Sequence, residues 1–156
     1  MSKGPPTPTG PGPSVFQPRA IVSTRSGDGD ASAPACSVVM TVYNDRRFVR
    51  EAVDSLLRQD FEDFELIIVD DCCDDPDFVA GLAALDSRIR VLRNVQNVGT
   101  AVSANRGIDA ARAAIIARLD SDDVAEPARI GRLVEALRAD PELGLVGSAV
   151  TYIDEG

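Results

Sequence analysis

The sequence predicts an α/β domain with a mostly parallel sheet and flanking helices, from about Cys36 to the C-terminus. Three observations support this fold class. Short apolar runs alternate along the chain with longer stretches of helical periodicity. The runs are continuous and rich in β-branched residues, as expected of strands buried on both faces of a parallel sheet. Hydrophobic residues make up 44% of the 156 residues, which is enough for the core of one such domain.

The first unit is a strand, a helix and a second strand. CSVVMTVY at 36–43 is a continuous apolar run. Asn44 or Asp45 can cap the following helix, which should extend to about residue 58 because apolar residues recur on one of its faces. FELIIVD at 64–70 is a second buried strand. A right-handed crossover would place these two strands in one parallel sheet.

The next unit is a helix, a short strand and another helix. Asp75 and Pro76 open the first helix, to about residue 85, because proline is tolerated at the first helical position. The short strand covers 89–93. A helix rich in Ala and Ser then runs from 99 to about 112, and its small side chains permit close packing.

The last predicted elements are a strand, a helix and a strand. AAIIARLD at 113–120 is the fourth strand. Pro127 starts a helix in which apolar residues follow the i, i+3, i+4, i+7 spacing of a buried face. GLVGSAVTYI at 144–153 is expected to be a fifth strand.

Residues 1–35 differ in composition from the rest. This segment is rich in Pro and Gly and then in small polar residues. Such a composition cannot bury enough apolar surface to offset its ordering entropy, so we expect a disordered N-terminal arm. The alternative is a proline-rich ligand for a partner protein.

Charge and composition exclude several classes of function. The formal net charge is −9, which argues against a nucleic-acid partner. The absence of histidine excludes Ser–His and Cys–His nucleophile pairs. Cys36, Cys72 and Cys73 do not form a disulfide framework, so we expect a cytoplasmic location, with peripheral attachment to a membrane as the alternative. No apolar run approaches the roughly 20 residues of a transmembrane segment.

Acidic residues gather where the predicted strands end. Asp70 and Asp71 end the second strand, and Asp120 and Asp122 end the fourth. Ligands of open α/β sheets bind beyond these carboxyl ends. Clustered carboxylates repel one another unless a cation neutralises them, and Mg²⁺ and Mn²⁺ bind carboxylates together with substrate phosphates. We therefore predict a metal-chelated diphosphate at Asp120-Ser121-Asp122.

Acidic residues after strands also cap helices and solvate loops. We assign Asp74, Asp75 and Asp123 to that role. Taken alone, Asp120 and Asp122 fit either interpretation equally well. Together with the Asp70-Asp71 pair and the polar end of the first strand, they favour a site.

The ordered motifs resemble the N-terminal, nucleotide-sugar-binding portion of family 2 glycosyltransferases, which have the GT-A fold. The blocks that carry the resemblance are SVVMTVYND, QDF, FELIIVDD, NVG with NRG, and ARLDSDD. The resemblance implies that the domain binds a UDP-, GDP- or dTDP-sugar through Mg²⁺ or Mn²⁺. It further implies transfer of the sugar to an unknown acceptor hydroxyl with inversion.

The resemblance also implies roles for five residues. Thr41 and Tyr43 would lie against the nucleotide base, and Asp71 would contact the base or its surroundings. Asp120 would lie near the ribose and diphosphate and would share the metal with Asp122, the expected metal ligand.

Two positions depart from the family pattern. Cys72-Cys73 stands where the family commonly has a Gly-Ser-type loop. Ala104 stands where many members carry an arginine, and Arg93 or Arg106 could substitute for its contact with the nucleotide.

The sequence offers no candidate for the catalytic base, which the family usually places well after the DxD block. We therefore expect 36–156 to be a donor-binding domain truncated at its C-terminal end, with the base supplied from outside these residues. The alternative function is a non-catalytic nucleotide-binding or interaction module.

Overall fold

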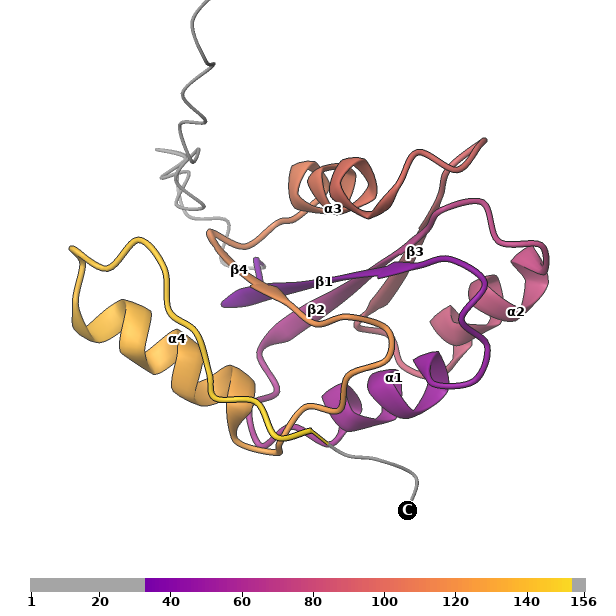
Figure 1. The fold of residues 1–156 in the computed structure, drawn as a ribbon. Helices are drawn as coiled ribbons and strands as arrows, with labels where there is room; N and C mark the ends of the chain where they lie inside the picture. Colours follow the sequence, from indigo (N-terminus) through magenta and orange to yellow (C-terminus); the bar gives the residue numbers. More distant parts are fainter. Residues whose placement is uncertain (1–32, 153–156) are drawn as a thin grey trace, which may run out of the picture.

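A computed structural model describes residues 33–152 and contains four parallel strands in the order β3-β2-β1-β4 (Figure 1). The strands are β1 Cys36–Val42, β2 Phe64–Asp70, β3 Ile89–Arg93 and β4 Ile115–Arg118. β1 lies at the centre, with β2 on one side and β4 on the other. The predicted parallel sheet is therefore confirmed, while residues 1–32 of the predicted arm lie outside the described part of the chain.

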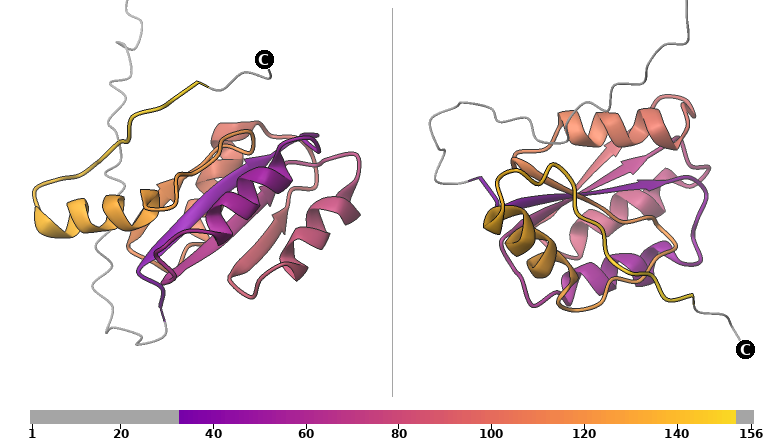
Figure 2. Two further views of the ribbon diagram at one scale, coloured as in Figure 1. Left: turned by 90° about the horizontal axis from the view of Figure 1, so that it is seen from below. Right: turned by 60° about the vertical axis from the view of Figure 1, so that its left-hand side comes forward.

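Helices cover both faces of the sheet (Figures 1 and 2). They are α1 Val49–Leu57, α2 Pro76–Gly81, the short 3₁₀ helix η1 Leu82–Ala84, α3 Thr100–Asp109 and α4 Arg129–Ala139. Of the helices within the described residues, α3 lies on one face, and α1, α2 and α4 lie on the other. None of the helices within 33–152 combines the length and apolar character needed to cross a bilayer.

The core forms because β1 and β2 are buried along their whole length. Alternate residues of each strand point to opposite faces. One set, including Met40 and Ile68, packs against the apolar face of α1. The other set includes Val39 and Val69, which lie under α3 beside Gly107. Burial on both faces explains why these strands are continuously apolar rather than alternating.

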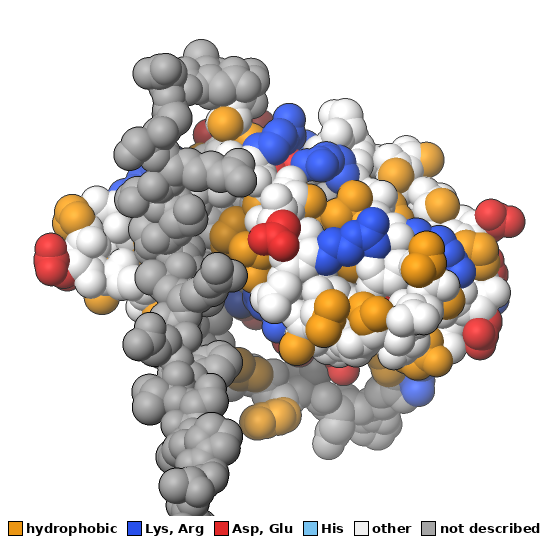
Figure 3. Space-filling model, turned by 90° about the horizontal axis from the view of Figure 1, so that it is seen from above, with side chains coloured by type: hydrophobic (Ala, Val, Ile, Leu, Met, Phe, Trp, Pro, Cys, Tyr) orange, Lys and Arg blue, Asp and Glu red, His pale blue; other side chains and the backbone are white. Residues whose placement is uncertain are grey.

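The face seen from above α3 carries basic side chains among hydrophobic ones, although the whole chain is acidic (Figure 3). Two arginines bond with the buried carboxylate of Glu65 in β2: Arg90 of β3 and Arg112, which follows α3, at 3.0 Å each. These basic groups therefore help to hold the layers together.

The predicted strand at 144–153 is wrong over its described part. Residues 144–152 form no strand, and Leu145, Val150 and Tyr152 are 74%, 74% and 97% exposed. Within 33–152 no neighbouring strand pairs with this segment, and a strand is stable only where its backbone groups find such partners. Its apolar composition alone was misleading.

Other boundaries differ in smaller ways. β4 is four residues long, shorter than the predicted 113–120. α1 begins at Val49 rather than after Asn44 or Asp45. Asp45 instead accepts a hydrogen bond from the Phe48 amide at 3.3 Å, which caps the turn before the helix. Asp75 caps α2 as predicted, accepting from the Phe78 amide at 3.1 Å.

Candidate functional site

The carboxyl ends of β1, β2 and β4 surround a pocket of about 410 Å³, within the range of small-molecule sites. Its lining residues are Thr41, Val42, Tyr43, Asp71, Thr100, Asp120, Ser121 and Asp122. All five residues predicted for the site from the sequence are among them. The structure thus brings together side chains that are up to 81 positions apart in the chain, between 41 and 122.

The end of β1 presents two residues to the pocket. Thr41 is buried and pairs with Val69 of β2. Tyr43 follows directly after the strand and is 55% exposed, although aromatic side chains usually bury most of their surface. Its ring is therefore free to pack against a flat ligand.

Asp71 lies at the end of β2 and is 2% exposed. Its Oδ1 accepts hydrogen bonds from Asn94 Nδ2 at 2.7 Å and from the Val98 amide at 2.9 Å. Its Oδ2 accepts from the Gly99 amide at 2.8 Å. Burial by itself would raise the pKa of Asp71, but these hydrogen bonds outweigh it and hold the pKa below the ordinary value. Asp71 is thus an ionised side chain that anchors the loop before α3.

The start of α3 contributes Thr100, which sequence analysis did not identify. Gly99 caps this helix with φ at 84°, a conformation that glycine adopts without strain. The NVG motif was the available signal, because its glycine marks the start of the helix and Thr100 is the first residue of that helix.

The loop after β2 is stabilised by Asp70 and Cys73. Asp70 is buried, forms an ion pair with Arg93, and accepts from the Cys73 amide at 2.7 Å. Burial raises the pKa of the Cys73 thiol to about 11, which keeps the thiol protonated. Cys72 has φ at 67°, in the left-handed region that favours glycine. The Cys72-Cys73 departure is thus accommodated locally in the loop.

The two arginines suggested as substitutes at Ala104 do not line the pocket. Arg93 binds Asp70 and the Cys73 carbonyl, and Arg106 donates to the Arg93 carbonyl at 2.6 Å. Both guanidinium groups are used to hold the loops after β2 and β3. The expectation that Arg93 or Arg106 contacts the nucleotide stays a prediction.

The turn after β4 carries the acidic motif. The side chain of Asp120 is 62% exposed and contacts Arg118 at 2.8 Å. Asp122 is exposed, and the Asp123 amide donates to the Asp120 carbonyl at 3.2 Å, which closes the turn.

The donor set at this turn fits a cation that is bound together with phosphate oxygens. Two exposed carboxylates at one edge are what Mg²⁺ or Mn²⁺ uses when the substrate supplies further ligands. Within the described residues, no group of three or more His, Cys, Asp or Glu side chains could by itself hold a metal. A closed structural metal cage is therefore not formed by this part of the chain.

Side chains of α1 and the residues after it fasten the loop between β4 and α4. Ser55 Oγ accepts from the Ala125 amide at 2.9 Å. Gln59 Nε2 donates to the Glu126 carbonyl at 2.8 Å, and its Oε1 accepts from the Ile130 amide at 2.9 Å. Both Ser55 and Gln59 are buried. Sequence analysis noted Gln59 only within the QDF block; its signal was a polar residue beside an otherwise apolar helix face.

Comparison with known proteins agrees with this geometry. Residues 37–156 match the family model described as Glycosyl transferase family 2. The uncharacterized glycosyltransferase MJ1057 of Methanocaldococcus jannaschii is 32% identical over 134 residues, which cover 81% of this chain and 45% of that protein. The chain thus spans less than half the length of this curated relative.

Among the solved structures that share the fold are two ligand-bound complexes. One is the mannosyltransferase PcManGT from Pyrobaculum calidifontis in complex with GDP-Man and Mn²⁺, with a TM-score of 0.62 and 25% identity over 71% of this chain and 34% of that one. The other is S. aureus TarS 1-349 in complex with UDP-GlcNAc, with a TM-score of 0.61 and 24% identity over 67% of this chain and 31% of that one. The sheet, the pocket at its carboxyl edge and the family match lead to one conclusion: this chain belongs to glycosyl transferase family 2 and has the GT-A fold.

Proposed function

We propose that this domain binds a nucleotide sugar in the pocket at the carboxyl edge of the sheet and serves as the donor half of a glycosyltransferase. The observation that carries the proposal is the convergence of Thr41, Tyr43, Asp71, Asp120 and Asp122 on that one pocket. Each residue comes from the end of a strand or the turn after it, where ligands of open α/β sheets bind.

The base would lie between Tyr43 and Asp71. The exposed tyrosine ring offers a flat apolar surface. Stacking on such a ring stabilises a bound base but does not discriminate between one base and another. Asp71 Oδ2 accepts a hydrogen bond from the Gly99 amide, and a carboxylate oxygen can accept more than one. Uracil, thymine and guanine each carry a ring N–H that could donate to it. This chemistry supports a UDP-, dTDP- or GDP-sugar as the donor.

The diphosphate would lie toward Asp120 and Asp122 with a bound Mg²⁺ or Mn²⁺. Anionic phosphates and an acidic turn repel each other, so a divalent cation is required between them. When bound, the cation supplies Lewis-acid stabilisation of the leaving diphosphate. The protein orients it through the two carboxylates. The complexes of PcManGT with GDP-Man and Mn²⁺ and of TarS with UDP-GlcNAc support this assignment.

The second candidate is a nucleotide-binding module without transferase activity. The carboxylates that line the pocket are all assigned to the nucleotide or the metal, and none is left to act as a base on an acceptor hydroxyl. Incubation with each nucleotide sugar separates the two candidates. Release of the nucleoside diphosphate, with or without a panel of hydroxyl acceptors, indicates turnover and rejects the module, whereas tight binding with no hydrolysis or transfer over the whole panel supports it.

Calorimetric titration of UDP, GDP and dTDP, with Mn²⁺ or with EDTA, tests the proposed site. We expect Mn²⁺-dependent binding of one nucleotide, and a loss of about tenfold or more in affinity for Asp122→Ala, roughly 1.4 kcal/mol. Asp123→Ala is the matched control, because Asp123 adjoins the motif but does not line the pocket. Binding that is absent, or that is the same in wild type and Asp122→Ala, would reject the proposal.

A further inference from the structure

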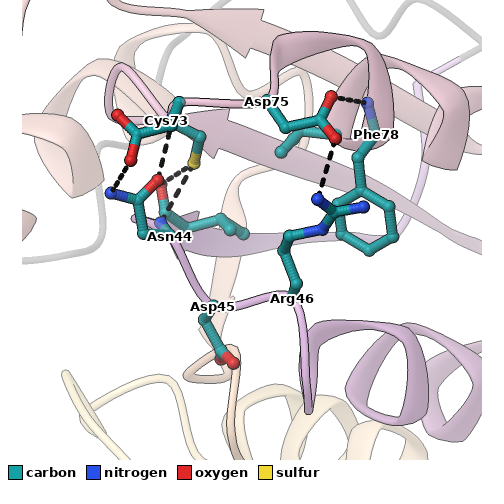
Figure 4. A pocket seen from close by; sticks show the side chains of 9 residues that line it. Asn44, Asp45, Arg46, Cys73, Asp75 and Phe78 are labelled. Atoms are coloured by element: carbon teal, nitrogen blue, oxygen red, sulfur yellow. Dashed lines mark hydrogen bonds and ion pairs between the residues drawn. The ribbon is translucent and has the colours of Figure 1, made fainter.

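A second pocket of about 260 Å³ lies beside the first, between the loops that follow β1 and β2 (Figure 4). Most polar groups on its wall bond to one another. Asn44 donates to Asp74 at 3.1 Å, and Arg46 pairs with Asp75 at 3.0 Å. Asp45 is the exception, because its carboxylate points away from these side chains (Figure 4). Its partner belongs to the acidic turn of the first pocket.

Asp45 joins that acidic turn to the start of α1. Its Oδ2 accepts a hydrogen bond from Ser121 Oγ at 2.8 Å, across 76 positions of sequence. Its Oδ1 accepts from the Phe48 amide at 3.3 Å, directly before α1. Asp45 is half-buried, so this carboxylate is a fixed point on which Ser121 can be held.

Ser121 is the central residue of Asp120-Ser121-Asp122. The hydrogen bond that the Ser121 hydroxyl donates to Asp45 fixes the rotamer of Ser121 and restrains the backbone between Asp120 and Asp122. The Asp123 amide restrains the same turn through the Asp120 carbonyl, at 3.2 Å. A turn that is already ordered loses less conformational entropy when a cation binds than a mobile turn does. Its affinity for the cation is therefore higher.

We propose that Asp45 is a positioning residue for the cation site. It holds Ser121 so that the carboxylates of Asp120 and Asp122 both face the nucleotide pocket. Asp45 does not itself ligate the metal, in keeping with the lack of a three-carboxylate metal group among residues 33–152. This inference rests on the proposed function, because it assumes that a cation binds at the turn.

Mn²⁺ titration in the presence of saturating UDP, followed by electron paramagnetic resonance of the free ion, tests this role. Asp45→Ala and Ser121→Ala should each weaken Mn²⁺ binding by about tenfold, the scale seen when a partner of a metal ligand is removed. The double variant should be no weaker than either single one, because both remove the same hydrogen bond. Asp45→Asn keeps an oxygen acceptor for Ser121 and should retain most of the affinity.

Three controls separate positioning from charge and from misfolding. Asp77→Ala removes one exposed negative charge from α2 and should leave Mn²⁺ affinity within about twofold. The urea midpoints of Asp45→Ala and Ser121→Ala show whether each variant is still folded under the conditions of the titration. Asp122→Ala should abolish the binding of Mn²⁺ that the titration measures.

The outcomes distinguish this inference from the proposed function. If Asp122→Ala keeps full Mn²⁺ affinity, the cation site itself is wrong. If Asp122→Ala loses affinity while Ser121→Ala keeps it, the cation site stands and the positioning role of Asp45 is overturned. Equal losses in Asp45→Asn and Asp45→Ala, with Ser121→Ala unaffected, would show that the charge of Asp45 acts rather than its hydrogen bond, and would also overturn the role.

Discussion

At Asp71, one buried carboxylate faces the pocket and also accepts three hydrogen bonds from the loop before α3. Its place at the site could be predicted from its position at a strand end. Its loop partners could not, because Asn94, Val98 and Gly99 are 23 to 28 positions away and no local pattern marks them. Residue roles that depend on long-range partners are the part that sequence reasoning misses.

Asp71→Asn should destabilise the domain and weaken nucleotide binding together. The side-chain NH₂ group of asparagine would face the backbone N–H groups of the loop, which now donate to the carboxylate. Buried N–H groups would then lack an acceptor, at a cost of about 1–3 kcal/mol. Urea denaturation measures the loss in the free energy of unfolding. Asp77→Asn, at an exposed position on α2, is the control and should change it by less than about 0.5 kcal/mol. Equal stability of the two variants would contradict the anchoring role of Asp71.

Glu65 shows the same chemistry at the opposite end of the sheet. It is 1% exposed and accepts from Ser37 Oγ at 2.7 Å and from the Arg112 amide at 2.8 Å, besides its ion pairs with Arg90 and Arg112. Burial would raise the pKa of Glu65, but these partners lower it below the ordinary 4.5. Its ionised form thus stabilises the fold.

The pH dependence of stability follows from that lowered pKa. A carboxyl with a lower pKa in the folded state contributes stability that is complete above its ordinary pKa of 4.5 and is lost as the pH falls through the folded value. We expect the urea concentration at the unfolding midpoint of the wild type to decrease as the pH is lowered below 4.5. Glu65→Gln should be less stable at pH 7 and show a shallower decline in acid, whereas Glu135→Gln, at an exposed site on α4, should follow the wild type. Parallel pH profiles for Glu65→Gln and wild type would contradict this account.

At the scale of elements, α3 packs closely on the sheet because Gly107 has no side chain. A Cβ placed there would lie 2.5 Å from Val39 Cγ1 and 3.1 Å from Val69 Cγ2. The sequence indicated this in outline, since the helix is rich in small residues. The particular glycine that faces the sheet could be identified only once the helix was placed over β1 and β2.

Gly107→Ala should destabilise the domain by about 1–3 kcal/mol, the usual cost of overpacking, even though alanine is the better helix former. Gly81→Ala is the matched control in α2. Within 33–152, no atom apart from the chain neighbours and the helix's own backbone lies within 4 Å of a Cβ at Gly81, so the substitution should be neutral or stabilise by up to about 1 kcal/mol. Thermal unfolding compares the two variants. A stabilising Gly107→Ala would show that α3 is not held against the sheet as described.

The elements themselves were predictable where burial on both faces left a clear pattern. β1 and β2 match their predicted ranges within one residue at each end. The segment 144–152 is also rich in apolar residues but forms no strand, because strand formation requires a neighbour as well as composition. Short β4 shows the same limit, since its ends were set by pairing with β1 rather than by its own sequence.

At the scale of the whole molecule, the order of the strands determines which side chains meet at the candidate site. β1 lies between β2 and β4, so Tyr43, Asp71 and Asp122 meet at one edge although each follows a different strand. The position of these residues at the ends of three parallel strands predicted their convergence, and the resemblance to the family implied their roles. Thr100, Ser55 and Gln59 were not predicted as part of the site, because their contribution depends on where α3 and α1 pack.

The central claim is that the nucleotide occupies this edge of the sheet rather than the neighbouring pocket around Asn44 and Phe78. A ¹H–¹⁵N NMR titration with UDP and Mg²⁺, repeated with GDP and dTDP, tests it residue by residue. We predict saturable shifts in the amides of 41–43, 71, 98–101 and 120–122, with small shifts at 76–81. Shifts centred on 44–46 and 74–79, or no saturable shifts with any of the three nucleotides, would contradict the account.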